Sequence, residues 1–184
     1  MVAPVVAHAL EEFRVAHPDL AAHILVAGIP PELADTAAMT EAYGMELALS
    51  VNCILVLGRR GQDRRVAACA VRATTRADVN HVVKQLLDVR KASFMSQDDA
   101  VAASGMEYGG ITPIGLPRDW RLLVDARVVG EPAGVDGEGP ETGGAVGSWA
   151  CIGSGLRSSK LFVPGAVLAA LPGAEVIGGL ATEV

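Results

Sequence analysis

Hydrophobic and polar positions alternate along the chain in two different periods. Apolar residues at helical spacing, bounded by proline, serine, aspartate or glycine, predict helices at residues 4–17, 32–43, 79–87, 96–105 and 164–171. Short apolar runs bounded by turn residues predict strands at residues 23–28, 52–57, 65–71, 91–95, 121–125, 149–152 and 174–177. Two of these runs flank the polar turn 58–63 and predict a hairpin.

The order of these elements bears on the fold class. Helices and strands interleave irregularly, without repeated strand–helix–strand units, which argues against a doubly wound nucleotide-binding fold. We expect the α+β class, with one mixed sheet and packed helices in a single domain spanning residues 1–184. A Gly-rich, acidic segment at 130–148 contains no base and predicts a loop or insertion.

Composition narrows the possible functions. The chain has 184 residues and is 51% hydrophobic, which suffices for one well-buried domain, and no apolar run is long enough to span a membrane. Aromatic residues make up only 4% of the chain, and 15 Lys and Arg stand against 21 Asp and Glu. These values argue against a base-stacking platform and against a strong sequence-independent polyanion binder.

The cysteines and the first residues indicate the compartment. Three separated cysteines without a Cys-x-x-Cys pair argue against a disulfide framework and against a zinc site. The start of the chain lacks the basic region of a signal peptide. We therefore expect a cytoplasmic protein with no metal and no cofactor.

The segment 105–117 is too rich in glycine and proline for a regular element. A stiff loop of this kind can expose N–H groups that hold a carboxylate, a phosphate or a developing oxyanion, although a tight crossover loop has the same composition. Its candidate binding residues are Gly109, Gly110, Thr112, Pro113 and Gly115.

A shorter turn, Gly153-Ser154-Gly155, follows the strand at 149–152, with Arg157 just beyond it. It can present amides and a hydroxyl to an anion, or be an ordinary turn. It has neither the spacing of a Walker loop nor that of a dinucleotide-binding fingerprint. The histidines likewise form no metal motif, and no Ser-His-Asp triad can be assembled from local signatures.

One dense basic patch stands out in the acidic chain, in the predicted hairpin turn. Four arginines fall within seven residues, namely Arg59, Arg60, Arg64 and Arg65. They fit a phosphate contact, and they equally fit a solvated turn.

Taken in order, these pieces resemble the YbaK/prolyl-tRNA editing-domain family over roughly residues 20–180. The segments that carry the resemblance are residues 36–44, 51–56, 77–84, 104–117, 123–125 and 152–155, with the helix that begins at Pro164. The resemblance implies a curved, mainly antiparallel mixed sheet. It also implies hydrolysis of the ester that joins a wrong amino acid to the 3′ end of a tRNA.

The resemblance also assigns roles to residues. The loop from Gly109 to Pro113 would shape the amino-acid pocket, and Gly153, Ser154 and Gly155 would lie beside the ester. Members of the family with editing activity carry a Lys where this chain has Asn52, and no Lys occurs before residue 84. Asn52 would therefore be an uncharged stand-in.

Two functions follow. The first is a trans-editing aminoacyl-tRNA deacylase whose partners are the acceptor end of mischarged tRNA and an aminoacyl-tRNA synthetase. The second is a regulatory module that binds aminoacyl-tRNA or a nucleotide without turnover, as the loss of the Lys and the acidic segment suggest.

Overall fold

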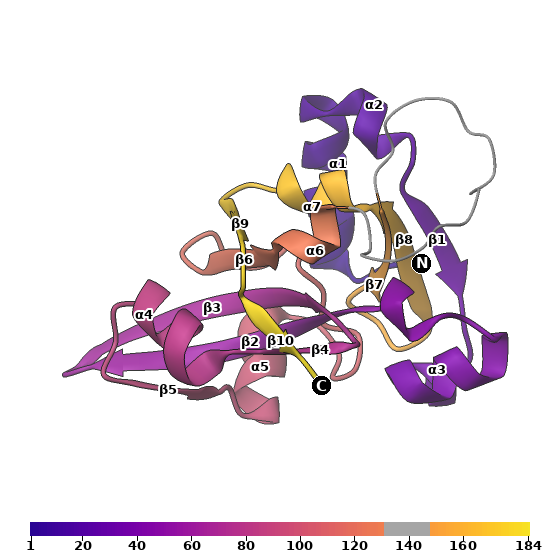
Figure 1. Cartoon of the computed structure of the whole chain (residues 1–184). Helices are drawn as coiled ribbons and strands as arrows, with labels where there is room; N and C mark the ends of the chain where they lie inside the picture. The colour runs from indigo at the N-terminus through magenta and orange to yellow at the C-terminus, as the bar shows by residue number, and fades with distance from the viewer. Residues whose placement is uncertain (131–147) are drawn as a thin grey trace.

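The computed structural model describes residues 1–130 and 148–184. The predicted loop at 130–148 lies, apart from its two end residues, outside the described residues. The described residues form three sheets with helices packed around them (Figure 1). This confirms the α+β class, and neighbouring strands are antiparallel except at two positions in the largest sheet.

The largest sheet has five strands in the order β5-β2-β3-β6-β9. Their bounds are Lys91–Phe94 for β5, Val51–Arg60 for β2, Asp63–Arg72 for β3, Arg121–Asp125 for β6 and Ala174–Ile177 for β9. The β2–β3 hairpin predicted from the sequence is present, with a turn tighter and strands longer than expected. The pairs β3–β6 and β6–β9 are parallel, so the sheet is mixed.

Two smaller sheets complete the strand architecture. One has the order β1-β8-β7, formed by Leu25–Gly28, Ser159–Pro164 and Trp149–Gly153, and the other pairs β4 (Thr75–Ala77) with β10 (Ala181–Glu183). A single parallel bridge between Ser50 and Cys151 connects the three-stranded sheet to the start of β2. The sequence prediction omitted β4, β8 and β10.

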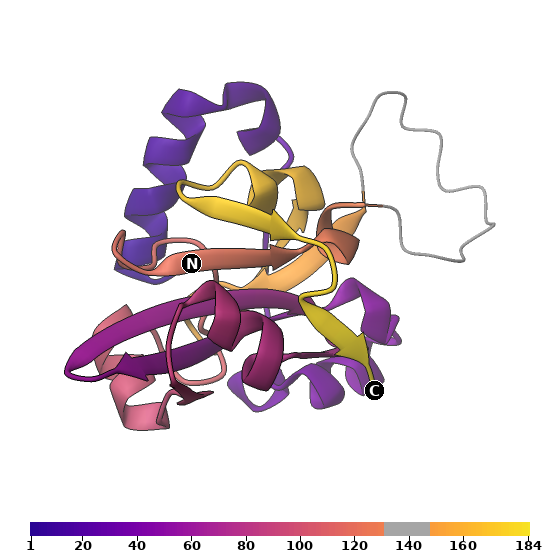
Figure 2. The same cartoon turned by 60° about the vertical axis from the view of Figure 1, so that its left-hand side comes forward.

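Helices cover both faces of the five-stranded sheet. They are α1 (Pro4–Ala16), α2 (Pro18–Ala21), α3 (Thr36–Tyr43), α4 (Lys84–Leu86), α5 (Gln97–Ser104), α6 (Ala126–Val129) and α7 (Gly165–Ala169). Short 3₁₀ turns at Pro31–Leu33 and Leu47–Leu49 flank α3, and a π-helical turn at Val79–Val83 precedes α4. Figure 2 shows α1 and α7 on one side of the long β2–β3 ribbon and α4 on the other.

Local signals explain most helix ends. Ser96 accepts a hydrogen bond from the N–H of Asp99 at the start of α5, and Gly105 ends it with a positive φ of 67°. The predicted helix at 32–43 was wrong at its start, because the backbone is extended at Asp35 and α3 begins at Thr36. This break turns the beginning of α3 toward β2.

The core lies on both faces of the large sheet. Ala68 and Ala70 of β3 face one apolar cluster, and Ala67, Cys69 and Val71 face the other. All five side chains are small or β-branched and fully covered, as expected of a central strand. The antiparallel pairing of β3 with β2 places Val71 opposite Asn52, at the start of β2.

At the far end of β6, Asp125 stabilises the start of α6. Its carboxylate is buried and accepts hydrogen bonds from the side chain and the N–H of Arg127 and from the N–H of Ala181. Burial alone would raise the pKa of Asp125, but these donors outweigh it and hold the pKa below its usual value.

Candidate functional site

A cavity of about 270 Å³ opens where the two larger sheets meet the beginning of α3. Its walls come from the segment before α3, the first residues of β2, the loop at 108–111, the end of β7 and one residue of β8. Asn52, Gly109 and Gly153 all line it. The structure thus brings together three segments that the sequence analysis singled out separately.

Asn52 lines this cavity next to the beginning of α3. The hydroxyl of Thr36 donates a hydrogen bond of 3.1 Å to Oδ1 of Asn52. That contact uses the oxygen of the amide and leaves its NH₂ group as the part of Asn52 with capacity for a ligand.

The Gly-rich loop and the Gly-Ser-Gly turn pack backbone against backbone. The N–H of Gly155 donates to the carbonyl oxygen of Gly110 at 2.7 Å. A Cβ atom on Gly153 would lie 2.3 Å from that same oxygen and 2.7 Å from the carbonyl oxygen of Ile111. Only glycine fits this approach, so the two motifs form one structural unit.

Two N–H groups of this unit have capacity for a ligand. Gly109 and Ile111 line the cavity, and within residues 1–130 and 148–184 no acceptor takes either of their N–H groups. Unpaired main-chain donors beside a cavity are the kind of group that stabilises a developing oxyanion.

Arg157 ties the rim of the site together. Its Nη1 donates to the carbonyl of Tyr108 and its Nη2 to the carbonyl of Pro31, both at 3.1 Å. Nη1 also lies 3.9 Å from the carboxylate of Asp35. The guanidinium therefore connects the Gly-rich loop to the segment before α3.

Ser154 has a different environment from the one expected. The residue is fully buried, and its Oγ lies 2.7 Å from Oγ of Ser159 and 3.0 Å from the carbonyl oxygen of Ser159. The hydroxyl thus holds the turn to the start of β8. It does not line the cavity described above.

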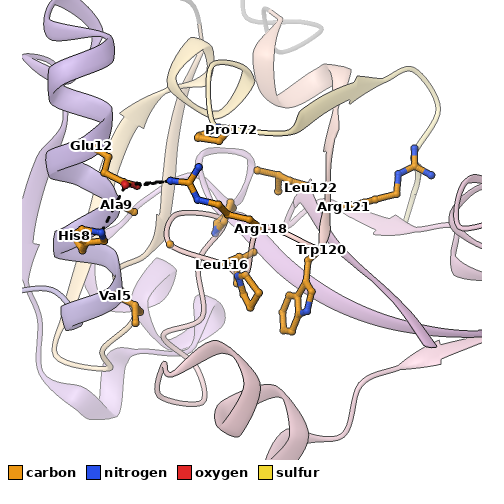
Figure 3. Close-up of a pocket in the computed structure, with 13 residues that line it drawn as sticks. Val5, His8, Ala9, Glu12, Leu116, Arg118, Trp120, Arg121, Leu122 and Pro172 are labelled. Carbon is orange, nitrogen blue, oxygen red and sulfur yellow. Dashed lines mark hydrogen bonds and ion pairs between the residues drawn. The ribbon is translucent and has the colours of Figure 1, made fainter. Parts of the chain in front are cut away.

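The second half of the Gly-rich loop faces away from this cavity. Pro113 and Gly115 line another hollow of about 330 Å³, against α1, together with Glu12, Arg118 and Trp120 (Figure 3). In that hollow Arg118 pairs with Glu12 at 3.0 Å. Thr112, which in sequence separates Ile111 from Pro113, is fully buried, and its hydroxyl has no partner among the described residues.

The arginine cluster lies at the tip of the β2–β3 hairpin, opposite the cavity. Arg59 is seven residues along β2 from Asn52, or about 23 Å at the rise of a strand. Arg60 and Arg65 each form an ion pair with the carboxylate of Asp88. The side chains of Arg59 and Arg64 are exposed.

Lys160, on the unpredicted strand β8, is the cavity residue that the sequence analysis missed. Only 7% of the residue is exposed, and its ammonium donates to the carbonyl oxygen of Ala34 at 2.6 Å. Burial lowers the pKa of Lys160, and the positive charge of Arg157 lowers it further, against the opposing effect of Asp35. The chain contains three lysines in all, and the position of Lys160 directly before an apolar run was the available sequence signal that this Lys is buried.

Cys151 and Cys53 also line the cavity, as thiols. Burial raises the pKa of Cys151 to about 11, although the ammonium of Lys160 acts in the opposite direction. Burial raises the pKa of Cys53 further still. Neither side chain is therefore a thiolate nucleophile near neutral pH.

Two features are absent from residues 1–130 and 148–184. No three or more His, Cys, Asp or Glu side chains gather there in an arrangement that could hold a metal ion. No helix in the same residues has the length and hydrophobicity needed to cross a membrane.

Comparison with known proteins places this architecture. The sequence model of the aminoacyl-tRNA editing domain matches residues 30–139. The structure resembles the hypothetical protein APE2540 (TM-score 0.71, 18% identity, covering 95% of this chain and 99% of that one).

It also resembles a protein described as a candidate trans-editing enzyme for prolyl tRNA synthetase. That match has a TM-score of 0.70 at 17% identity and covers 100% of both chains. No curated protein matches the sequence. The chain belongs to the aminoacyl-tRNA editing domain family.

Proposed function

We propose that this protein is an aminoacyl-tRNA deacylase that hydrolyses the ester between a wrongly attached amino acid and the 3′ end of a tRNA. The observation that carries the proposal is the cavity formed by Asn52, the first half of the Gly-rich loop and the end of β7. Family membership supplies the substrate class.

The chemistry of this substrate suits the groups at hand. An aminoacyl ester is activated, and the neighbouring ribose hydroxyl can assist an attacking water. Main-chain donors at Gly109 and Ile111 can stabilise the negative oxygen that forms on the carbonyl. Orientation and oxyanion stabilisation together can supply much of the required acceleration. The backbone of the Gly-rich loop packs tightly against Gly153 at one wall of the cavity, and for this reason we propose that the amino acid removed is small.

Contact with the rest of the tRNA requires positive charge elsewhere on the surface. We propose that Arg59 and Arg64 at the hairpin tip contact phosphates of the acceptor stem. The support is their exposure and their distance from the cavity, about 23 Å along β2, which suits a duplex that extends away from its bound 3′ end.

The experiment is to incubate the protein with adenosine carrying alanine, serine or proline as a 3′ ester. We expect release of the free amino acid above the uncatalysed rate for at least one of the three. The proposal would be refuted if none of the three esters and none of the matching mischarged tRNAs released its amino acid faster than in the uncatalysed reaction.

A second function, binding without turnover, is favoured by one observation. Asn52 carries no charge, and its oxygen is already engaged by Thr36. A binding module would be stabilised against heat by an aminoacyl-adenosine ester that stays intact during long incubation. Cleavage of that ester excludes this alternative.

A further inference from the structure

The cavity contains one buried cation, and its surroundings have a definite geometry. In β8, Lys160 has Ala27 of β1 and Gly153 of β7 as its two lateral neighbours. Both neighbours are too small to cover its side chain. Lys160 therefore extends over them into the cavity, toward the carbonyl oxygen of Ala34.

The burial of this ammonium needs an explanation. Removing a charged ammonium from water is unfavourable unless its N–H groups are paired. An ammonium has three such donors, and within the described residues only the Ala34 carbonyl accepts one of them. The carboxylate of Asp35, the nearest negative charge, is largely exposed and lies on the side of Arg157.

A core lysine with a purely structural role would have further acceptors. Arg72 provides the comparison in this chain, because its buried guanidinium is held by the carbonyls of Ala48, Trp149 and Val128 and by the hydroxyl of Ser148. Lys160 has one acceptor and an open cavity beside it. The missing acceptors are therefore expected to come from a ligand.

We propose that Lys160 is a catalytic residue whose ammonium donates to the carbonyl oxygen of the bound aminoacyl ester and stabilises the negative charge that forms there. The inference rests on the proposed function and deepens it. Lys160 thus adds a positive charge on β8 to the main-chain donors of Gly109 and Ile111, in a cavity where β2 offers the uncharged Asn52.

In the step concerned, the oxygen of water bonds to the carbonyl carbon and the π electron pair moves to the carbonyl oxygen beside Lys160. When that pair returns, the bond to the ribose oxygen breaks. A proton from the attacking water ends on the ribose oxygen, and the amino acid leaves as the acid, which ionises in solvent. Lys160 stays protonated throughout.

The test uses Lys160→Met, which keeps an unbranched side chain one atom shorter and removes its charge. Lys91→Met is the matched control, because Lys91 is exposed on the edge strand β5. We expect kcat for the ester to fall about a hundredfold or more in Lys160→Met, with KM little changed. Lys91→Met should behave as the natural protein does.

Two unreactive analogues separate this inference from the deacylase proposal. One replaces the ester carbonyl with an anionic, tetrahedral phosphonate, and the other replaces the ester with a neutral amide. We expect Lys160→Met to weaken phosphonate binding at least about tenfold and to weaken amide binding much less, because the amide carries a hydrogen-bond acceptor but no negative charge.

Each outcome decides the matter. Equal phosphonate binding by the natural protein and Lys160→Met overturns the inference. So does a loss of amide binding as large as the loss of phosphonate binding together with a lower melting temperature, which would make Lys160 structural. If the natural protein cleaves no ester, the deacylase proposal fails, and the two analogues still decide whether Lys160 binds an anion.

Discussion

The contact between Gly153 and the Gly-rich loop gives the sharpest prediction of the structure. In Gly153→Ala the new Cβ would lie 2.3 Å from the carbonyl oxygen of Gly110, whereas ordinary contact begins at 3.4 Å. The loop, or the end of β7, must therefore move by about 1.1 Å. Overpacking of this kind costs about 1–3 kcal/mol, because a backbone oxygen cannot rotate away as a side chain can.

The same displacement should lower the rate of catalysis as well as the stability. A shift of about 1 Å in groups that position the substrate can lower kcat about a hundredfold. In a chain of this size, about 1–3 kcal/mol corresponds to a fall of roughly 2–12 °C in the melting temperature. Calorimetry and hydrolysis of an aminoacyl-adenosine ester measure the two effects on the same samples.

Gly28→Ala is the matched control for this experiment. Gly28 ends β1 in the same sheet, and a Cβ there meets nothing within 4 Å. Its melting temperature and rate should stay at the natural values. If Gly153→Ala melted and hydrolysed like Gly28→Ala, the close packing of the two motifs would be wrong.

Three further predictions concern other parts of the molecule. Asp125→Asn should lower the free energy of unfolding by about 1–3 kcal/mol at neutral pH. When the pH is lowered below about 4, the stability of this variant should decrease less than that of the natural protein. The reason is that Arg127 holds the pKa of Asp125 below its unfolded value, so the stabilisation is present above that value and disappears as pH falls through the folded pKa. Replacing Arg59 and Arg64 with Gln should flatten the slope of log affinity for tRNA against log salt by about 2, measured by filter binding, and an unaltered slope would make the tip a solvated turn. Cys151→Ala should retain hydrolysis, because a thiol with a pKa of about 11 is not ionised at neutral pH, and a hundredfold loss of rate would contradict this.

Much of the fold could be predicted from the sequence, because the signals for its helices, strands and turns are local. The caps at Ser96 and Gly105, the hairpin around residues 58–63 and the strand 121–125 each depend on a few neighbouring residues. The sequence did not predict the strand β8, because Ser158 and Ser159 at its start are typical of a turn and Pro164 at its end predicted only the helix that follows. Because β8 was not predicted, the sequence could not indicate that Lys160 belongs to the site.

The division of the Gly-rich loop was also beyond sequence reasoning. Glycine and proline indicate an irregular backbone, but they do not indicate which part of the protein each residue of the loop contacts. Gly109 lines the cavity beside α3, while Pro113 and Gly115 contact the region of α1, to which no sequence signal linked them. The hydroxyl of Ser154 was similarly unpredictable, because its partner Ser159 belongs to the missed strand.

The most direct test of the deacylase function is a turnover measurement on tRNAs deliberately charged with a wrong small amino acid. The natural protein, at a concentration well below that of the tRNA, should release the amino acid from at least one such tRNA through many cycles and leave the correctly charged tRNA intact. Release no faster than in buffer from every mischarged tRNA would contradict the deacylase function.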